Sequence, residues 1–437
     1  MFKRVILSVA VIAAAALVVW AFTSPKADKG GESSASVPSP AVTAKPTQAP
    51  AAPEPTPEPT VYLEPSEARI TVGGDIVVHM DINNQAWSDG GDTYDYKPMF
   101  QDIRHYIEDA DYASCCLETT FLGDGNYTGY PMFRSPDQLV YDLKDVGFDL
   151  IATASNHCLD SWKRGLDRTL DLMDEAGLDH VGTYRTQEER DANNGILVKE
   201  INGISIAFLD FTYGTNGMPK EEYPYAVNVY YKDYMTNFNY LDYDMVDADM
   251  AAARALDTDI IAVIVHWGIE YRTTPVTAQT DFADYLFQQG ADLVLGGHPH
   301  VPESMEKRTI TNPDGTTREG FVCYCLSNLL SSMNDDYTYL TALLQIDLVK
   351  DNNTGETVIK DVGYIPVVLV DAHDYGVYNA GWRYRLWELY SAVDDYEAGN
   401  DRGVMTENMY SRFKGFITDL QNICGADYDL IARERNS

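Results

Sequence analysis

The chain has 437 residues and a hydrophobic fraction of 45%, so it is long enough to bury a large core. It carries 67 acidic and 32 basic side chains, which gives a formal net charge of −35 at pH 7. Such an acidic chain offers no basic stripe that could follow a phosphate backbone, so nucleic acid is excluded as a partner. An anionic polymer would need a local cationic site in order to bind here.

Residues 1–23 are predicted to form a membrane segment. Lys3 and Arg4 precede an uncharged apolar run from Val5 to Phe22, which is about long enough to cross the hydrocarbon core of a bilayer. The positive flank predicts a single-pass protein at the cell membrane with its main domain outside. A cleaved signal peptide is the alternative. We favour an uncleaved anchor because no small-x-small cleavage site follows directly and no cysteine offers a lipid anchor.

Three further parts follow the anchor. Residues 24–66 are rich in Pro, Ala, Ser and Thr and cannot bury a core, so we expect an extended, disordered stalk. Residues 67–372 are predicted to form the main domain. Residues 373–437 predict a small helical extension, with helices over Tyr384–Tyr396 and Thr406–Ile423.

Within the main domain, short apolar runs alternate with amphipathic segments, as in α/β proteins. Later segments alternate like antiparallel strands, and Asn312–Gly315 predicts a hairpin turn. A tyrosine-rich stretch over 216–243 predicts an irregular insertion near the functional site. We therefore expect mixed β-sheets with helices outside. The predicted strands cover 69–74, 111–117, 148–154, 204–209, 259–265, 291–295, 321–326 and 340–348, and the predicted helices cover 98–110, 135–146, a segment ending before Gly177, and 276–289.

Five of the predicted strands end in side chains that suit a divalent metal. In α/β proteins the loops after buried strands carry the chemistry, so we expect these side chains to converge at one edge of the sheet. A mixture of carboxylate, amide and imidazole ligands suits one or two ions such as Mn, Zn or Fe. The candidate metal ligands are Asp75, Glu118, Asn156, His266, His298 and His300.

Two neighbouring residues are candidates for proton transfer. His157 could protonate a leaving group, and Asp160 could orient it through the other ring nitrogen. If two ions lie about 4 Å apart, Glu118 is the candidate bridging carboxylate. Each of these residues also has a structural interpretation, as a turn residue, an ion-pair partner or a packed histidine. The remaining histidines, which we interpret as structural, are His79, His105, His180 and His373.

Five segments of the main domain carry these candidate residues, and Ser327-Asn328 follows them. The segments are, in order, Gly74-Asp75, Leu117-Glu118-Thr119, Asn156-His157 with Asp160, His266-Trp267-Gly268-Ile269-Glu270-Tyr271, and Gly296-Gly297-His298-Pro299-His300-Val301. Taken in order, they resemble the motifs of the bacterial capsule-synthesis CapA family over about Arg69 to Ala372, and Ser327-Asn328 lies where the family has a Leu-Gly-Asn turn. The resemblance implies a metallophosphatase-like fold, a role in poly-γ-glutamate synthesis or export, and the metal-ligand and general-acid roles given above. It also implies that Glu270 and Tyr271 line the pocket.

The chain also departs from the pattern that the resemblance implies. Metallophosphatases usually begin with Asp-x-His, but this chain has Val77 at the histidine position, so one ligand of the first metal is missing. Glu118 stands in place of a bridging aspartate, and Cys116 and Ser155 stand where the family commonly has asparagine. The missing ligand argues against tight occupancy by two ions and against ordinary phosphatase activity.

Three functional hypotheses remain open. The first is a membrane-anchored, extracytoplasmic metal-dependent hydrolase or transferase that acts on an anionic envelope polymer such as poly-γ-glutamate. Trp267, Arg134 and Arg272 are then substrate-binding candidates with Glu270 and Tyr271, although Arg134, Arg272 and Arg185, a further anion-binding candidate, could equally form structural ion pairs. The second is a non-catalytic, polymer-binding subunit of a capsule synthase or exporter. The third is a metal-dependent phosphoesterase.

Overall fold

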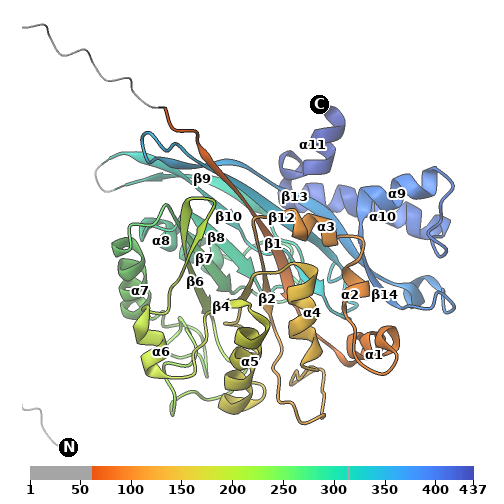
Figure 1. Cartoon of the computed structure of the whole chain (residues 1–437), viewed down its shortest axis with the longest axis horizontal. Coiled ribbons are helices and arrows are strands. Elements are labelled where there is room, and N and C mark those ends of the chain that lie inside the picture. The colour runs from red at the N-terminus through yellow and green to blue at the C-terminus, as the bar shows by residue number, and fades with distance from the viewer. Residues whose placement is uncertain (1–61, 313–314) are drawn as a thin grey trace, which may run out of the picture. The chain divides into compact units, whose positions relative to one another are not determined.

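Two mixed β-sheets pack against each other in this computed structural model, which describes residues 62–312 and 315–437 (Figure 1). The predicted membrane segment and almost all of the predicted stalk lie outside the described residues. Among the helices that the structure describes, none is long and apolar enough to cross a membrane.

The first sheet, sheet 1, has the strand order β14-β13-β12-β1-β2-β3-β4, and β11 pairs with the end of β1. Strands β1 to β4 run parallel, whereas β12, β13 and β14 are antiparallel to their neighbours. Sheet 1 is therefore mixed. Its strands are β1 (Ser66–Ile76), β2 (Tyr112–Leu117), β3 (Leu150–Ala152), β4 (Asp179–Val181), β11 (Asn328–Leu330), β12 (Leu340–Lys350), β13 (Thr357–Asp371) and β14 (Tyr384–Glu388).

The second sheet, sheet 2, has the strand order β5-β6-β7-β8-β10-β9. Its four central strands are parallel, and its two edge strands are antiparallel. The predicted turn at 312–315 falls between β9 and β10 in the sequence, and its residues 313–314 lie outside the described residues. The predicted strands over 321–326 and 340–348 belong to different sheets. The strands of sheet 2 are β5 (Leu197–Ile201), β6 (Ile204–Thr212), β7 (Ile260–His266), β8 (Leu293–Gly297), β9 (Met305–Thr311) and β10 (Thr317–Cys323).

Strand β7 shows why the central strands are continuously apolar. Every residue of β7 is buried. Ile260 and Ile264 belong to the core between the two sheets, whereas Ile261 and Val265 belong to the core between sheet 2 and its outer helices. Because side chains alternate across a strand, a strand covered on both faces needs apolar residues at every position.

Helices cover the outer faces of both sheets. The segments α1 (Met80–Gly90), α2 (Lys97–Phe100), α3 (Arg104–Glu108), α4 (Gln138–Val146) and α5 (Trp162–Ala176) share a core with sheet 1, and α7 (Tyr243–Ala255) and α8 (Thr277–Gln288) share one with sheet 2 (Figure 1). The short helix α6 (Gln187–Ala192) precedes β5. The predicted fold of mixed sheets with helices outside is confirmed. The predicted helix over 98–110 is divided into α2 and α3.

The C-terminal segment differs from its predicted form. The first part of the predicted helix Tyr384–Tyr396 is strand β14, which pairs with β13, because Tyr384 and Leu386 face one core while Trp387 faces another. Helix α9 (Leu389–Glu397) follows directly, and the Glu388 carboxylate caps it by accepting two backbone N–H bonds. The last helices are α10 (Glu407–Leu420) and α11 (Leu430–Asn436).

The C-terminal helices belong to the same core as the sheets. Phe413 and Leu420 of α10 are fully buried in the cluster that lies between sheets 1 and 2. The described residues, 62–312 and 315–437, form one compact unit. The segment after 372 is thus part of the main hydrophobic core.

Phe413→Ala should therefore lower the free energy of unfolding of the whole domain by about 3–5 kcal/mol, since it removes a large buried side chain. Chemical denaturation followed by circular dichroism would measure this change. The exposed neighbour Lys414→Ala should change stability by less than about 0.5 kcal/mol. A separate early transition confined to the C-terminal helices would contradict a shared core.

Candidate metal centre

The predicted ligands meet where the carboxyl ends of the parallel strands of both sheets come together. Asp75 is the penultimate residue of β1, and Glu118 and Asn156 follow β2 and β3 of sheet 1. His266 ends β7, and the turn with His298 and His300 follows β8 of sheet 2. The expectation of a single sheet edge was wrong, because sheet 1 supplies the oxygen ligands and sheet 2 supplies the imidazoles.

The turn after β8 approaches Asp75 closely. A Cβ atom on Gly297 would lie 2.6 Å from Asp75 Oδ1, so only glycine fits at this position. The backbone N–H of His298 donates a hydrogen bond to Asp75 Oδ2 at 2.9 Å. His298 and His300 both have positive φ, at 97° and 59°, a conformation that non-glycine residues adopt at a cost. This hydrogen bond holds the turn against the carboxylate, and His300 Nδ1 lies 3.9 Å from Asp75 Oδ2.

Glu118 lies between two imidazoles. Its Oε2 is 3.6 Å from His266 Nε2, and its Oε1 is 3.8 Å from His300 Nδ1. Glu118, His266 and His298 form one group whose ligand atoms lie within 4.8 Å of one another, and Asp75, Glu118 and His300 form a second such group. Both groups share Glu118, which is the candidate bridging carboxylate.

The chemistry of these groups fits a divalent cation. Asp75, Glu118 and the three histidines are each at most 4% exposed. Asp75 Oδ1, both Glu118 oxygens and His298 Nδ1 have no hydrogen-bond partner among the described residues, and no lysine or arginine there pairs with either carboxylate. Buried polar atoms without partners are costly, and a bound cation would satisfy them.

Burial also sets the protonation of the cluster. It raises the pKa of Asp75 to about 7, against the opposing effect of the His298 N–H bond. Burial and the nearby Asp75 raise the pKa of Glu118 well above its usual range. Burial lowers the pKa of His266 and His298 well below the usual value and that of His300 to about 3. The three imidazoles are therefore neutral, which is the form that binds metals.

His157 and Asp160 lie together as the sequence indicated. His157 Nδ1 is 2.8 Å from Asp160 Oδ2, which also accepts the backbone N–H of Phe133 at 2.6 Å. The Phe133 ring packs edge-on against the imidazole, with 4.7 Å between ring centroids. These contacts fix the orientation of His157 and leave its Nε2 for chemistry.

An aromatic cavity of about 610 Å³ adjoins the cluster at His298. Tyr230, Tyr231 and Phe238 of the predicted tyrosine-rich insertion line it, so this segment lies at the site. The predicted pocket residues Trp267, Glu270 and Tyr271 line it as well. Trp267 is buried and its Nε1 donates to the backbone oxygen of Tyr324, so its ring forms a fixed wall.

The predicted anion-binding arginines are mostly engaged elsewhere. Arg134 donates to Ser161 and pairs with Asp124 at 3.6 Å. Arg185 pairs with Asp171, Asp174 and Glu189. Their structural interpretation holds. Arg272 is exposed and makes no ion pair within the described part of the chain.

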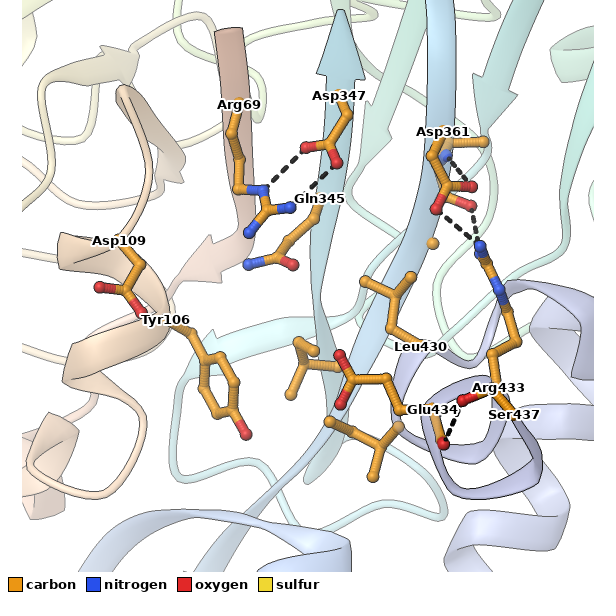
Figure 2. A pocket seen from close by; sticks show the side chains of 14 residues that line it. Arg69, Tyr106, Asp109, Gln345, Asp347, Asp361, Leu430, Arg433, Glu434 and Ser437 are labelled. Atoms are coloured by element: carbon orange, nitrogen blue, oxygen red, sulfur yellow. Dashed lines mark hydrogen bonds and ion pairs between the residues drawn. The ribbon is translucent and has the colours of Figure 1, made fainter. Parts of the chain in front are cut away.

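A second cavity, of about 550 Å³, lies over β1, β12 and β13 beside α11 (Figure 2). Its two arginines are paired with its own aspartates, Arg69 with Asp347 at 2.7 Å and Arg433 with Asp361 at 2.6 Å. No histidine lines this cavity. The candidate metal ligands therefore mark the other cavity as the candidate site.

Two residues near the cluster received no role from the sequence. The Tyr213 ring lies 4.6 Å from that of His298 and nearly parallel to that of His266. Tyr213 comes just after β6, so the strand-end rule would have found it had the predicted strand extended beyond 209. Asn328, in the turn noted only as a family feature, places Oδ1 2.8 Å from His300 Nδ1.

Comparison with known proteins places this site in a family. The model of the family described as "Bacterial capsule synthesis protein PGA_cap" matches residues 69–333. The chain belongs to this family. The resemblance seen in the sequence is thereby confirmed, and the match ends before β12.

Two relatives carry informative names. The capsule biosynthesis protein CapA of Bacillus anthracis is 25% identical over 307 residues, which cover 68% of this chain and 67% of that protein. The PGA biosynthesis protein CapA of Bacillus subtilis strain 168 is 27% identical over 287 residues, which cover 64% of this chain and 68% of that protein.

Solved structures are more distant. A phosphatase of Mycoplasma pneumoniae has a TM-score of 0.37 and 15% identity, covering 69% of this chain and 94% of its own. A protein of Thermus thermophilus has a TM-score of 0.32 and 9% identity. The match covers 68% of this chain and 98% of the Thermus thermophilus chain. Similarity at this level supports no inference about activity.

With metal removed by a chelator, Asp75→Asn should become more stable relative to the wild type as the pH rises from about 4 to about 7. The folded pKa of Asp75, about 7, lies above the unfolded value of about 3.9, so the folded wild type keeps a proton that the unfolded chain releases. Its contribution to wild-type stability therefore falls over this window, by on the order of 4 kcal/mol, whereas asparagine does not titrate.

Urea unfolding of both proteins across this pH range would measure the difference. The histidines titrate in the opposite direction in both proteins. Glu118 also titrates in both, and because the nearby Asp75 raises its pKa, the stability difference reports on this pair of carboxylates. A stability difference that stays constant with pH would contradict the raised pKa.

Proposed function

We propose that this protein is a membrane-anchored, extracytoplasmic component of capsule or poly-γ-glutamate biosynthesis or export, and that it is a metal-dependent hydrolase or transferase acting on an anionic envelope polymer. The observation that carries the catalytic part is the buried cluster around Glu118, with its unpartnered oxygen and nitrogen atoms. The capsule and PGA biosynthesis names of the two CapA relatives support the substrate.

Each residue then has a chemical task. A bound Mn, Zn or Fe ion would polarise a carbonyl or phosphoryl oxygen and activate water. His157, held at Nδ1 by Asp160, delivers a proton from Nε2 to the leaving group. Tyr271 and Glu270 position the polymer substrate in the cavity beside His298. Arg272 is the predicted arginine that is left to contact a carboxylate of the polymer.

The location belongs to the same proposal. The apolar run Val5–Phe22 with Lys3 and Arg4 supports a single-pass anchor at the cell membrane with the folded domain outside, where an envelope polymer is accessible. Other subunits of a capsule synthase are the partners that this location favours.

A second candidate function is a non-catalytic, polymer-binding subunit of a synthase or exporter. Val77, which stands where a metal-binding histidine was expected, supports it. The two functions differ in cells. If the site is catalytic, His298→Ala/His300→Ala should abolish capsule production while the protein is still made and localised, whereas continued production would favour the binding subunit.

The full-length protein should bind a divalent metal, and His266→Ala should weaken binding by at least about a hundredfold, since even indirect contacts to metal ligands are worth 10–100-fold. Elemental analysis and calorimetry would measure both. His180→Ala is the matched control, because His180 pairs with Asp174 outside the cluster. A wild-type protein that binds no metal would refute the catalytic proposal.

His157→Ala should lower the rate of polymer cleavage or transfer by about a hundred- to ten-thousandfold, with unchanged metal content, because it removes the proton donor but no ligand. Asp160→Asn should have a smaller effect in the same direction. The assay uses purified poly-γ-glutamate, with a generic phosphodiester as a second substrate. Turnover of the phosphodiester alone, lost in His266→Ala, would instead indicate a phosphoesterase.

A further inference from the structure

Two histidines of the cluster have matching surroundings. His266 Nε2 lies 3.0 Å from Asn156 Oδ1 and 3.6 Å from Glu118 Oε2. His300 Nδ1 lies 2.8 Å from Asn328 Oδ1 and 3.8 Å from Glu118 Oε1. Each imidazole thus faces an amide oxygen and one of the two Glu118 oxygens.

These spacings are those of atoms that share an ion. Ligand atoms that lie about 2.1 Å from one metal are about 3 Å apart, as both amide–imidazole pairs are. The lone pairs of a neutral imidazole nitrogen and an amide oxygen repel each other unless a proton or a cation lies between them. Asn156 is one of the candidate ligands predicted from the sequence, and Asn328 has the same geometry.

We propose that Asn328 is a metal ligand that replaces the histidine missing at position 77, so that the cluster holds two ions. Asp75, Glu118, His300 and Asn328 would hold one ion, and Glu118, Asn156, His266 and His298 the other. This inference rests on the proposed metal-dependent function. It revises the expectation that the missing histidine argues against tight occupancy by two ions.

The backbone holds Asn328 beside Asp75. The two residues are partners in the parallel register of β1 and β11. The N–H of Asp75 donates to the Ser327 carbonyl at 2.9 Å, and a Cβ on Gly74 would lie 2.0 Å from that oxygen. Ser327 has φ of 74°, so the turn that presents Asn328 is itself in a costly conformation.

Hydrogen bonds also fix which end of the amide faces the cluster. Asn328 is fully buried, and its Nδ2 donates to the Thr338 carbonyl at 3.1 Å. Its oxygen is therefore the atom directed at His300. Ser327 Oγ donates to the His300 carbonyl at 2.8 Å, which ties the two turns together.

Val77 cannot serve in this role. Its side chain is apolar and fully buried, and its N–H donates to Leu330 at the end of β11. The same strand that pairs with this part of β1 thus supplies the replacement oxygen two residues earlier, at Asn328.

The test is a count of bound ions. Full-length protein is loaded with Zn²⁺, freed of excess metal by gel filtration and analysed for zinc per chain. The wild type should hold two ions, Asn328→Ala one, and Asn156→Ala one. Asn228→Ala, which changes a buried asparagine bonded to Tyr184 and Asp210, should still hold two. Thermal unfolding would show whether each variant is folded.

A second measurement separates a ligand from a residue that only orients His300. In Zn²⁺-loaded protein labelled with ¹⁵N-histidine, a ligand role for Asn328 requires zinc at His300 Nδ1 and the proton at Nε2. An orienting role requires the proton at Nδ1 and zinc at Nε2, and that result would overturn the proposal. If Asn328→Ala does not fold, Asn328→Asp should hold two ions, with the second bound at least about tenfold more tightly because its ligand is charged.

The failures are distinguishable. A wild type with one ion, or two ions in folded Asn328→Ala, would overturn the role of Asn328 and leave a metal-dependent function standing. A wild type with no ion would remove both.

Discussion

Two carboxylates, Asp75 and Glu118, are buried side by side without a lysine or arginine among the described residues to neutralise them. Such a pair is unfavourable in a site closed to water, so it must hold protons or face cations. The neutral histidines around it supply lone pairs and no charge. The geometry of the site therefore depends on these two anions, and a divalent cation is the partner that their surroundings favour.

Both sheets contribute side chains to the cluster around these two carboxylates. Sheet 1 supplies the oxygen atoms and sheet 2 the imidazoles, so the cluster forms only when the two sheets pack together. The cost of the close approach is visible in the backbone. Glycine is required where β8 meets Asp75, and the turns that present His298, His300 and Asn328 contain residues with positive φ. The packed core that joins the sheets offsets this local strain.

The charge of the chain restricts how a polyanion could bind. Arg134 and Arg185 are neutralised by carboxylates near them, and the cavity beside the cluster is lined by aromatic rings and Glu270. In an acidic protein, bound metal ions would supply most of the local positive charge. Metal binding and recognition of an anionic polymer are thus expected to be coupled.

The sequence alone predicted the fold class and most of the candidate ligands that the structure brings together. Apolar runs that end in Asp75, Glu118, Asn156 or a histidine mark strand ends, because buried strands must be apolar and reactive groups gather where they stop. It could not show that the ends belong to two sheets, because both sheets have the same local pattern. It also predicted a helix where β14 pairs with β13, since pairing partners are distant in the chain. Only the tertiary structure placed Asn328 beside His300, because that contact depends on β11 pairing with β1 across some 250 residues.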